Sequence, residues 1–205
     1  SVLLNDTFNG VAIVPGTTPV TATLLAPPAG YTMAPDGVIT VAGSVPPSAV
    51  TLQYQVCETA APTNCATAQA IVAVRPDAAN DALPAAAVGT SVLDVLANDT
   101  VPANPVVTIA VPPTNGIAVV NADGSISYTP TAGFTGTDTL TYQVCLPAPD
   151  SAVCHTAVVT ITVAATLLQA ANDDFRPAAL APGGGSTPSV LLNDTFNGVA
   201  IVPGT

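Results

Sequence analysis

The sequence has no lysine and no tryptophan, only one histidine, and only two arginines, Arg75 and Arg176. Affinity for a phosphate backbone is built from lysine and arginine, so this composition excludes nucleic acid as a partner. No uninterrupted apolar run is long enough to cross a bilayer, which requires about 20 residues. We therefore expect neither a nucleic-acid-binding protein nor a membrane span in these 205 residues.

The same scarcity bears on catalysis. Thirteen acidic side chains stand against two basic ones, which gives a formal net charge of −11. No nucleophile motif lies near His155, so only carboxylate chemistry is left, and no paired-acid motif is present. We predict that the chain is not an enzyme and interpret His155 as a solvated residue at the start of a strand.

An internal repeat is the most informative feature that is present. Residues 1–17, SVLLNDTFNGVAIVPGT, recur without any change at residues 189–205. Packing tolerates many conservative substitutions, so folding alone does not require such identity. The recurrence indicates recent duplication in a long tandem array, and such arrays are usually structural.

A second, more diverged repeat lies within the first. The segment AVTLQYQVCETAAPTNC at 49–65 resembles TLTYQVCLPAPDSAVC at 139–154, and the Asp36-Gly37 turn has a counterpart at Asp123-Gly124. The triplet Asn-Asp-Thr also recurs along the chain. The repeat unit is therefore built from two related segments of about 90 residues, each large enough to form one small core.

Apolar and polar residues alternate with period two, which predicts strands. The alternation runs through 50–56 and 68–74, and again through 140–144 and 157–163. We also expect strands just after each Asp-Gly turn and in the SVLLND segment at 1–6. Prolines and glycines separate the short apolar runs and so mark turns. About seven short strands per segment predict an all-β protein built from sandwiches.

The four cysteines form two close pairs, Cys57 with Cys65 and Cys145 with Cys154. In each pair, one cysteine ends a predicted strand and the other begins the next, so the two face each other across a short loop. Four cysteines allow three connectivities, and we favour the two local disulfides because the alternatives would join separate segments. Each would contribute about 2 to 3 kcal/mol through chain entropy and implies an oxidising compartment.

Residues 78–163 contain SVLDVLANDT, NADGSISYTPTAGFTGTDTLTYQVC and HTAVVTITV. This stretch resembles the bacterial immunoglobulin-like and cadherin-like (VCBS-type) tandem repeats of large secreted adhesins and surface filaments. The first segment matches more loosely, because AGSVPPSAV replaces the Gly-Phe-Thr-Gly-Thr-Asp turn. The resemblance implies two tandem immunoglobulin-like β-sandwich domains of Greek-key type, located outside the cell or at the bacterial cell surface.

We predict three regions along the chain. They are a first immunoglobulin-like domain without its leading strand (1–76), a second such domain (77–165), and a linker with the leading strands of the next copy of the first domain (166–205). One interpretation, which we favour, is a continuous tandem array. The other is that the tail completes the first domain of another molecule by strand addition, through Ser189, Val190, Leu191 and Leu192.

The resemblance also implies calcium at domain junctions. Calcium takes six to eight oxygen ligands, so it needs clustered carboxylates and carbonyls. The candidate ligands are Asn80, Asp81 and Asp99 at one junction, and Asn172, Asp173 and Asp174 at the other. The competing interpretation, which we favour, is that each Asn-Asp pair caps a turn with its side chains. No other cofactor is expected.

The sequence thus predicts a structural repeat unit of a long extracellular bacterial filament or adhesin stalk. Its units would be arranged end to end, and its partners would be identical repeat units. The alternative is an adhesin module that binds a ligand or a glycan. Against that alternative, the scarcity of tryptophan, tyrosine and arginine removes the residues that usually dominate binding energy at interfaces.

Overall fold

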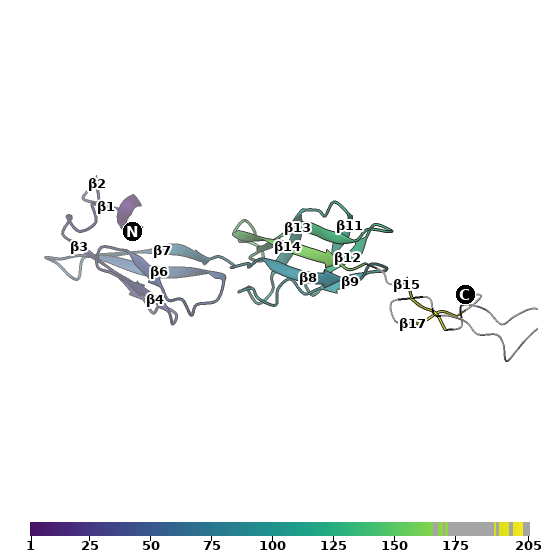
Figure 1. Ribbon diagram of the computed structural model, residues 1–205. Coiled ribbons are helices and arrows are strands. Elements are labelled where there is room, and N and C mark those ends of the chain that lie inside the picture. Colours follow the sequence, from purple (N-terminus) through teal and green to yellow (C-terminus); the bar gives the residue numbers. More distant parts are fainter. Residues whose placement is uncertain (166–167, 170, 172–190, 192, 197–198, 203–205) are drawn as a thin grey trace, which may run out of the picture.

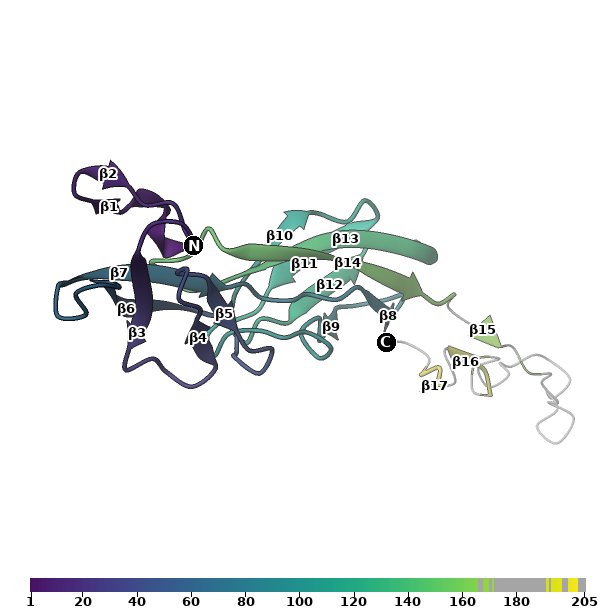
Figure 2. The same cartoon turned by 90° about the vertical axis from the view of Figure 1, so that its left-hand side faces the viewer.

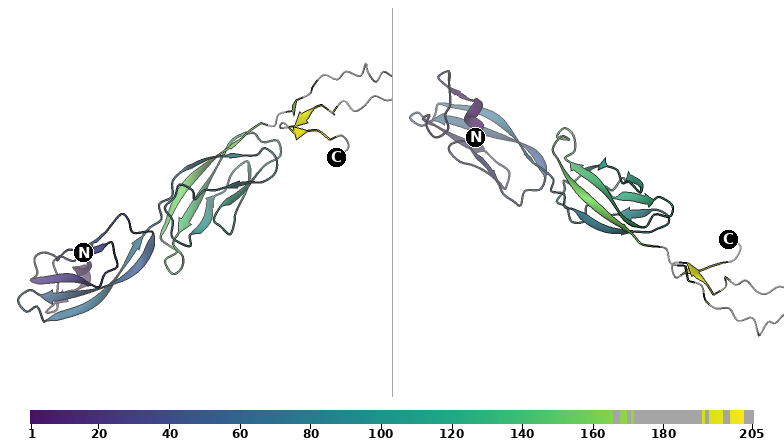
Figure 3. Two further views of the ribbon diagram at one scale, coloured as in Figure 1. Left: turned by 90° about the horizontal axis from the view of Figure 1, so that it is seen from below. Right: turned by 45° about the horizontal axis from the view of Figure 1, so that its top comes forward.

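The protein is all-β, as the period-two alternation predicts, and the strands form two lobes that lie end to end (Figure 1). Figure 3 shows the same arrangement from two further directions. The only helical element among the described residues is the 3₁₀ turn η1 (Val2–Asn5), and no helix there is long and apolar enough to cross a membrane. The computed structural model describes residues 1–165, 168–169, 171, 191, 193–196 and 199–202.

The C-terminal lobe comprises β8 to β14 and is a sandwich of two sheets. Its larger sheet has the order β10-β13-β14-β8, where β8 runs parallel to β14 and the other pairs are antiparallel. The smaller sheet has the order β11-β12-β9. The bounds are β8 (Asp81–Ala85), β9 (Ser91–Leu93), β10 (Val106–Val111), β11 (Gly116–Val120), β12 (Ile126–Pro130), β13 (Gly136–Cys145) and β14 (Cys154–Val163).

The core of the C-terminal lobe follows the predicted alternation. Leu140, Tyr142 and Val144 on β13 point inward, and every second residue of β14 from Ala157 to Val163 does the same. Thirteen buried apolar residues, from both sheets, from the turn after β9 and from the segment before β8, form one cluster. Burial on one face and exposure on the other is what fixes the register of these strands.

The Asp-Gly turns lie where the sequence predicts them. Gly124 has a φ of +87° and Gly37 a φ of +79°, the left-handed region that glycine adopts without steric cost. In each turn the aspartate carboxylate accepts a hydrogen bond from a backbone N–H two residues on, which is that of Ser125 in one turn and Val38 in the other. These bonds fix the direction in which the following strand leaves.

The N-terminal lobe comprises β1 to β7 and is less complete. Figure 2 shows its sheet β3-β6-β7 beside the two-stranded sheet β4-β5. Only Leu3, Ile13 and Ala22 form its buried cluster, although Tyr31, Leu52 and Tyr54 are also buried. The bounds are β1 (Thr7–Phe8), β2 (Val11–Ala12), β3 (Val20–Leu25), β4 (Tyr31–Met33), β5 (Ile39–Val41), β6 (Ser48–Glu58) and β7 (Cys65–Val74).

The predicted strand in SVLLND is wrong, because this segment forms η1 instead. Three apolar residues in succession carry no period-two signal. The turn buries Leu3 and leaves Leu4 70% exposed. The Ser1 hydroxyl caps the turn by accepting a hydrogen bond from the N–H of Leu3, and Val2 N donates to Gly37 O at 2.9 Å.

Both local disulfides are present. Cys57 lies directly opposite Cys65 at the open end of the β6-β7 pair, and Cys145 lies opposite Cys154 in β13-β14. This confirms the pairing that the sequence favours, and no described cysteine is free. Each bond closes the loop of one hairpin.

Beyond the C-terminal lobe, β15 (Leu168–Gln169) pairs antiparallel with β16 (Thr195–Phe196), which pairs with β17 (Val199–Ala200). The β16-β17 register repeats that of β1-β2, since Thr195 faces Ala200 as Thr7 faces Ala12. The duplicated sequence therefore adopts the same hairpin twice.

Candidate functional site

In the C-terminal lobe, the chain leading into β8 is held by Asp99 and Tyr142. The N–H of Ala79 donates to Asp99 Oδ1 at 2.7 Å, and the Tyr142 hydroxyl donates to Asp99 Oδ2 at 2.8 Å. The same hydroxyl lies 2.9 Å from Val95 O and 3.1 Å from Ala79 O. Burial and the bond to Asp99 raise the pKa of Tyr142, so the hydroxyl keeps its proton and bridges three segments of the chain.

Asn80 and His155 hold the same leading segment from its other side. Asn80 Oδ1 accepts from the N–H of Val158, and His155 Nδ1 accepts from the N–H of Ala78, both at 2.9 Å. Asp77 Oδ1 lies 3.3 Å from the same Nδ1. His155 lies at the start of β14, as predicted, where it is the second residue, but its side chain is only 27% exposed and anchors the segment.

The calcium candidates Asn80, Asp81 and Asp99 come together at this place. Asp81 is 8% exposed and its Oδ2 has no hydrogen-bond partner, while burial and the nearby charge of Asp99 raise the pKa of Asp81 to about 6. Asn80 Oδ1 and both Asp99 carboxylate oxygens already accept hydrogen bonds. No group of three or more His, Cys, Asp or Glu side chains in the described part of the chain is placed to hold a metal.

The side-chain oxygens of Asn80 and Asp99 therefore hold the leading strand through bonds to residues distant in sequence, and the turn-capping interpretation of the Asn-Asp pair stays a prediction. Calcium at this junction stays a prediction. The other calcium candidates, Asn172, Asp173 and Asp174, lie outside the described residues. So do Ser189, Val190 and Leu192 of the predicted added strand, while Leu191 is described and 39% exposed.

Asp138 joins parts of the C-terminal lobe that are separate in sequence. It is buried and accepts hydrogen bonds from the N–H groups of Thr114 and Asn115 and from the Tyr128 hydroxyl, at 3.2, 2.9 and 2.9 Å. Burial alone would raise its pKa, but these bonds together lower the pKa of Asp138. The carboxylate thereby ties the β10-β11 loop to β12 and β13.

The N-terminal lobe contains half of the Asp99-Tyr142 arrangement. The Tyr54 hydroxyl donates to Asp6 Oδ2 at 3.1 Å, as Tyr142 does to Asp99. No described residue donates a hydrogen bond to Asp6 Oδ1, the atom that corresponds to the acceptor of Ala79 N. Asp6 Oδ1 thus differs from Asp99 Oδ1, which accepts from the N–H of Ala79.

The C-terminal tail, residues 166–205, contains the other half of this arrangement, the bond from a backbone N–H to the aspartate. Asp194 occupies in residues 189–205 the position that Asp6 occupies in residues 1–17. Its Oδ1 accepts from the N–H of Ala171 at 2.8 Å, and Asp194 is buried at 8% exposure, whereas Asp6 is only half-buried. The same sequence thus makes the C-terminal-lobe contact wherever its leading segment is present.

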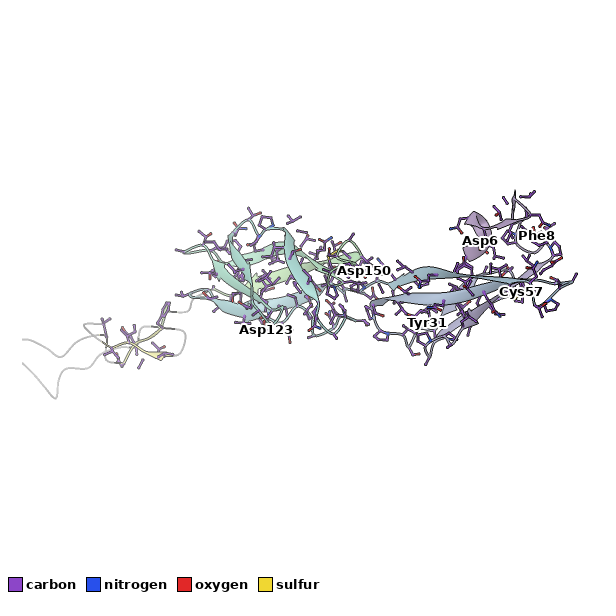
Figure 4. All side chains as sticks on the ribbon, turned by 180° about the vertical axis from the view of Figure 1, so that it is seen from behind. Asp6, Phe8, Tyr31, Cys57, Asp123 and Asp150 are labelled. Atoms are coloured by element: carbon purple, nitrogen blue, oxygen red, sulfur yellow. A yellow bond between two sulfur atoms is a disulfide. The ribbon has the colours of Figure 1, made fainter. Side chains whose placement is uncertain are left out.

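A groove of about 500 Å³ opens beside Asp6 in the N-terminal lobe. Figure 4 shows Asp6, Phe8 and Cys57 near one another at the end of the N-terminal lobe that lies farthest from the other lobe. The groove walls come from β1, the end of β6 and the start of β7. The described lining residues are Asn5, Asp6, Thr7, Phe8, Asn9, Ile13, Val20, Val56, Cys57, Glu58, Asn64, Cys65, Ala66, Thr67 and Ala68.

The chain matches a known family over part of its length. Residues 69–162 match the family model of the bacterial Ig domain. The C-terminal lobe is a bacterial Ig domain. This confirms the resemblance drawn from its sequence motifs and the all-β, Ig-like fold class, while the second Ig-like domain in the first segment stays a prediction.

Solved structures resemble the chain only distantly. An endo-fucoidan hydrolase from glycoside hydrolase family 107 is 12% identical, with 72% of this chain and 24% of that chain covered and a TM-score of 0.31. The human desmocollin-1 ectodomain is 16% identical, with 73% and 36% covered and a TM-score of 0.30. Human protocadherin-24 EC1-2 is 18% identical, with 76% and 87% covered and a TM-score of 0.31. At these TM-scores the likeness carries no functional argument, and no curated protein matches the sequence.

A second cleft, of about 420 Å³, lies where the Ig domain meets the N-terminal lobe. Pro46 and Pro47 line it from one side, and Pro102, Pro147 and Pro149 from the other. Asp150, also in its lining, is labelled at this junction in Figure 4. Proline fixes the backbone φ angle, so the loops that meet here have little conformational freedom.

The Asp-Tyr pairs were not predicted from the sequence. The three Asn-Asp-Thr triplets and the two Tyr-Gln-Val-Cys segments are visible repeats, but Asp99 and Tyr142 lie far apart along the chain. The signal that could have found them is the joint recurrence of the two motifs in the Ig domain and in the first segment, which suggests that the motifs act together.

Proposed function

We propose that the chain is a structural repeat unit of a long extracellular bacterial filament or adhesin stalk, with its lobes arranged end to end. The observation that carries this proposal is the verbatim recurrence of residues 1–17 at 189–205. A second copy of the opening hairpin, β16-β17, starts beyond the Ig domain, on the side away from the N-terminal lobe (Figure 1). This position suits a lobe that continues the same line.

The proposal includes the predicted division of the chain into domains. We take 1–76 and 77–165 as two Ig-like domains and 166–205 as the linker and the start of the next copy. The buried clusters of the two lobes share no residue, which is expected of separately folded units. A tandem chain of such units would make contacts mainly between neighbours.

Location and chemistry agree with a mechanical role. A bacterial Ig domain and one disulfide in each lobe suit an oxidising environment outside the cytoplasm. The buried ionisable side chains Asp138 and Tyr142 are engaged in joining strands and loops. The Ig-like fold is typically non-enzymatic, and we assign the chain no reaction.

Electron microscopy of the native material tests the proposal. We expect uniform threads in which each two-lobe unit advances about 70 to 90 Å along the axis, given strands of ordinary length and their loops. Mass spectrometry of the denatured material should show a ladder or one very long chain. Dispersed globular particles that bind a glycan array would refute the filament and favour the glycan-binding alternative.

A further inference from the structure

The Ig domain shows what the N-terminal lobe lacks. In the Ig domain, β8 covers the edge of β14 and β9 covers the edge of β12. The corresponding edges of the N-terminal lobe, on β7 and β5, have no outer partner among the described residues. Because β8 and β9 follow each other along the chain, one continuous segment would supply both missing strands.

Burial along β7 shows how much of the N-terminal lobe depends on that segment. The inward residues of β14, Val159 and Ile161, are fully buried. Their counterparts in β7 are Ala70 and Val72, aligned through the opposed cysteines, and both are only half-buried. A sheet edge that exposes both its backbone groups and its apolar face is a template for strand addition.

The repeat identifies the segment. Asn80-Asp81, at the start of β8, has its counterpart at Asn172-Asp173, upstream of the second copy of residues 1–17. From this alignment, Phe175 takes the position of Leu83, which packs against the Ig-domain core. The alignment therefore places a large apolar side chain opposite the half-buried face of β7.

From these observations we infer that the groove of the N-terminal lobe, together with the open edge of β7 that continues from it, binds residues 168–188 of a second copy of this sequence, the copy that precedes it in the array. The inference rests on the proposed function, since it needs copies in succession. The C-terminal tail shows how this segment pairs with the second copy of residues 1–17. There, Gln169 faces Thr195, and the N–H of Ala171 donates to Asp194 Oδ1. In the completed lobe, Gln169 faces Thr7, and Ala171 N donates to Asp6 Oδ1.

The parallel pairing of β8 with β14 predicts the register between β7 and the part of the bound segment that follows Ala171. Ile161 faces Leu83 and Val163 faces Ala85 in the Ig domain. In the completed N-terminal lobe, Phe175 therefore faces Val72, and Pro177 faces Val74. Proline suits this place, because an outer strand tolerates the loss of one N–H donor.

A peptide of residues 168–188 tests the inference directly. The acceptor is the full chain carrying Phe175→Asp, so that its own segment is disabled as a donor and its groove stays free. The probe is the synthetic peptide with a fluorescent label, followed by anisotropy. We expect saturable binding, and a peptide with Phe175→Asp should bind about tenfold more weakly or worse, because it would bury an unpaired carboxylate.

Two neighbouring acceptor substitutions provide the matched control. Val72→Asp places a charge on the half-buried inward face and should abolish binding. Ile71→Asp places the same charge on the outward face, where Ile71 is 73% exposed. This variant should bind the peptide as tightly as the parent acceptor does. Circular dichroism must first show that both variants retain the β spectrum of the parent.

Each outcome decides the matter. Absence of binding to a folded acceptor, or equal binding by the Val72→Asp and Ile71→Asp variants, would overturn the inference. Light scattering of the unmodified chain adds a second readout, since any oligomers should disappear with Val72→Asp, and oligomers that persist count against it. If the native material forms threads but the peptide does not bind, the inference fails and the proposed function stands.

Discussion

Three matched Tyr→Phe substitutions measure how strongly the leading strand is held. In the Ig domain the Tyr142 hydroxyl is buried and donates to the Asp99 carboxylate between two backbone carbonyls. Hydrogen bonds to charged groups contribute about 1.5 to 3 kcal/mol, and leaving a buried acceptor without a donor costs the same order. We expect Tyr142→Phe to lower the free energy of unfolding of the Ig domain by about 2 to 3 kcal/mol.

The same substitution in the N-terminal lobe should cost less. Tyr54 donates only to Asp6, whose carboxylate lines the groove and is reached by water. Water can replace the lost donor there, so we expect Tyr54→Phe to cost about 0.5 to 1.5 kcal/mol. Tyr31→Phe is the control, because the buried Tyr31 hydroxyl has no hydrogen-bond partner. Its removal should be neutral or slightly stabilising.

Hydrogen exchange followed by mass spectrometry suits this comparison, because peptides from β13 and β6 report the two lobes separately. The order of destabilisation should be Tyr142→Phe, then Tyr54→Phe, then Tyr31→Phe. Equal losses for Tyr142 and Tyr54, or a cost below about 0.5 kcal/mol for Tyr142→Phe, would refute the clamping role of this hydroxyl. So would a Tyr31→Phe loss as large as either.

The remaining predictions concern the disulfides, acid and calcium. Replacing both cysteines of either disulfide with alanine should lower the stability of that lobe alone by about 2 to 3 kcal/mol, measured by the same exchange experiment, and a loss shared by both lobes would contradict this. The lowered pKa of Asp138 stabilises the fold above the unfolded pKa of about 4, so its contribution to the stability of the Ig domain should be lost as pH drops below that value. Asp138→Asn should make the fall in stability with acid smaller and leave the part that comes from Asp123, whose pKa is also lowered. Calcium should leave the melting temperature unchanged, because the oxygens of Asn80 and Asp99 already accept hydrogen bonds; a rise that Asp99→Asn abolishes would instead establish a calcium site.

The features that the sequence predicts well are those encoded over short distances. The alternation in 140–144 and 157–163 places β13 and β14, and the short spacing of Cys145 and Cys154 identifies their disulfide. The Asp123-Gly124 turn is predicted for the same reason, since one residue pair carries both the side-chain acceptor and the positive φ.

The features that escape prediction depend on contacts between distant residues. Asp99 reads as a turn residue or a calcium ligand until the fold brings the Tyr142 hydroxyl and Ala79 N to it. Asp138 reads as a local turn residue, because nothing near it in sequence indicates the N–H groups of Thr114 and Asn115. The apolar composition of SVLLND favours a strand. The 3₁₀ turn that forms instead is explained by the burial of Leu3, which the sequence does not reveal.

The parallel pairing of β8 with β14 has a consequence for how the Ig domain carries tension. The polypeptide runs into this domain through β8 and out of it through β14, which face each other over five residue pairs from Asp81 to Ala85 and from Val159 to Val163. A pull on the two chain ends slides these strands past each other lengthwise. The backbone hydrogen bonds between the two strands then share the load and must break together. In a hairpin pulled open from its end, these bonds would break one at a time.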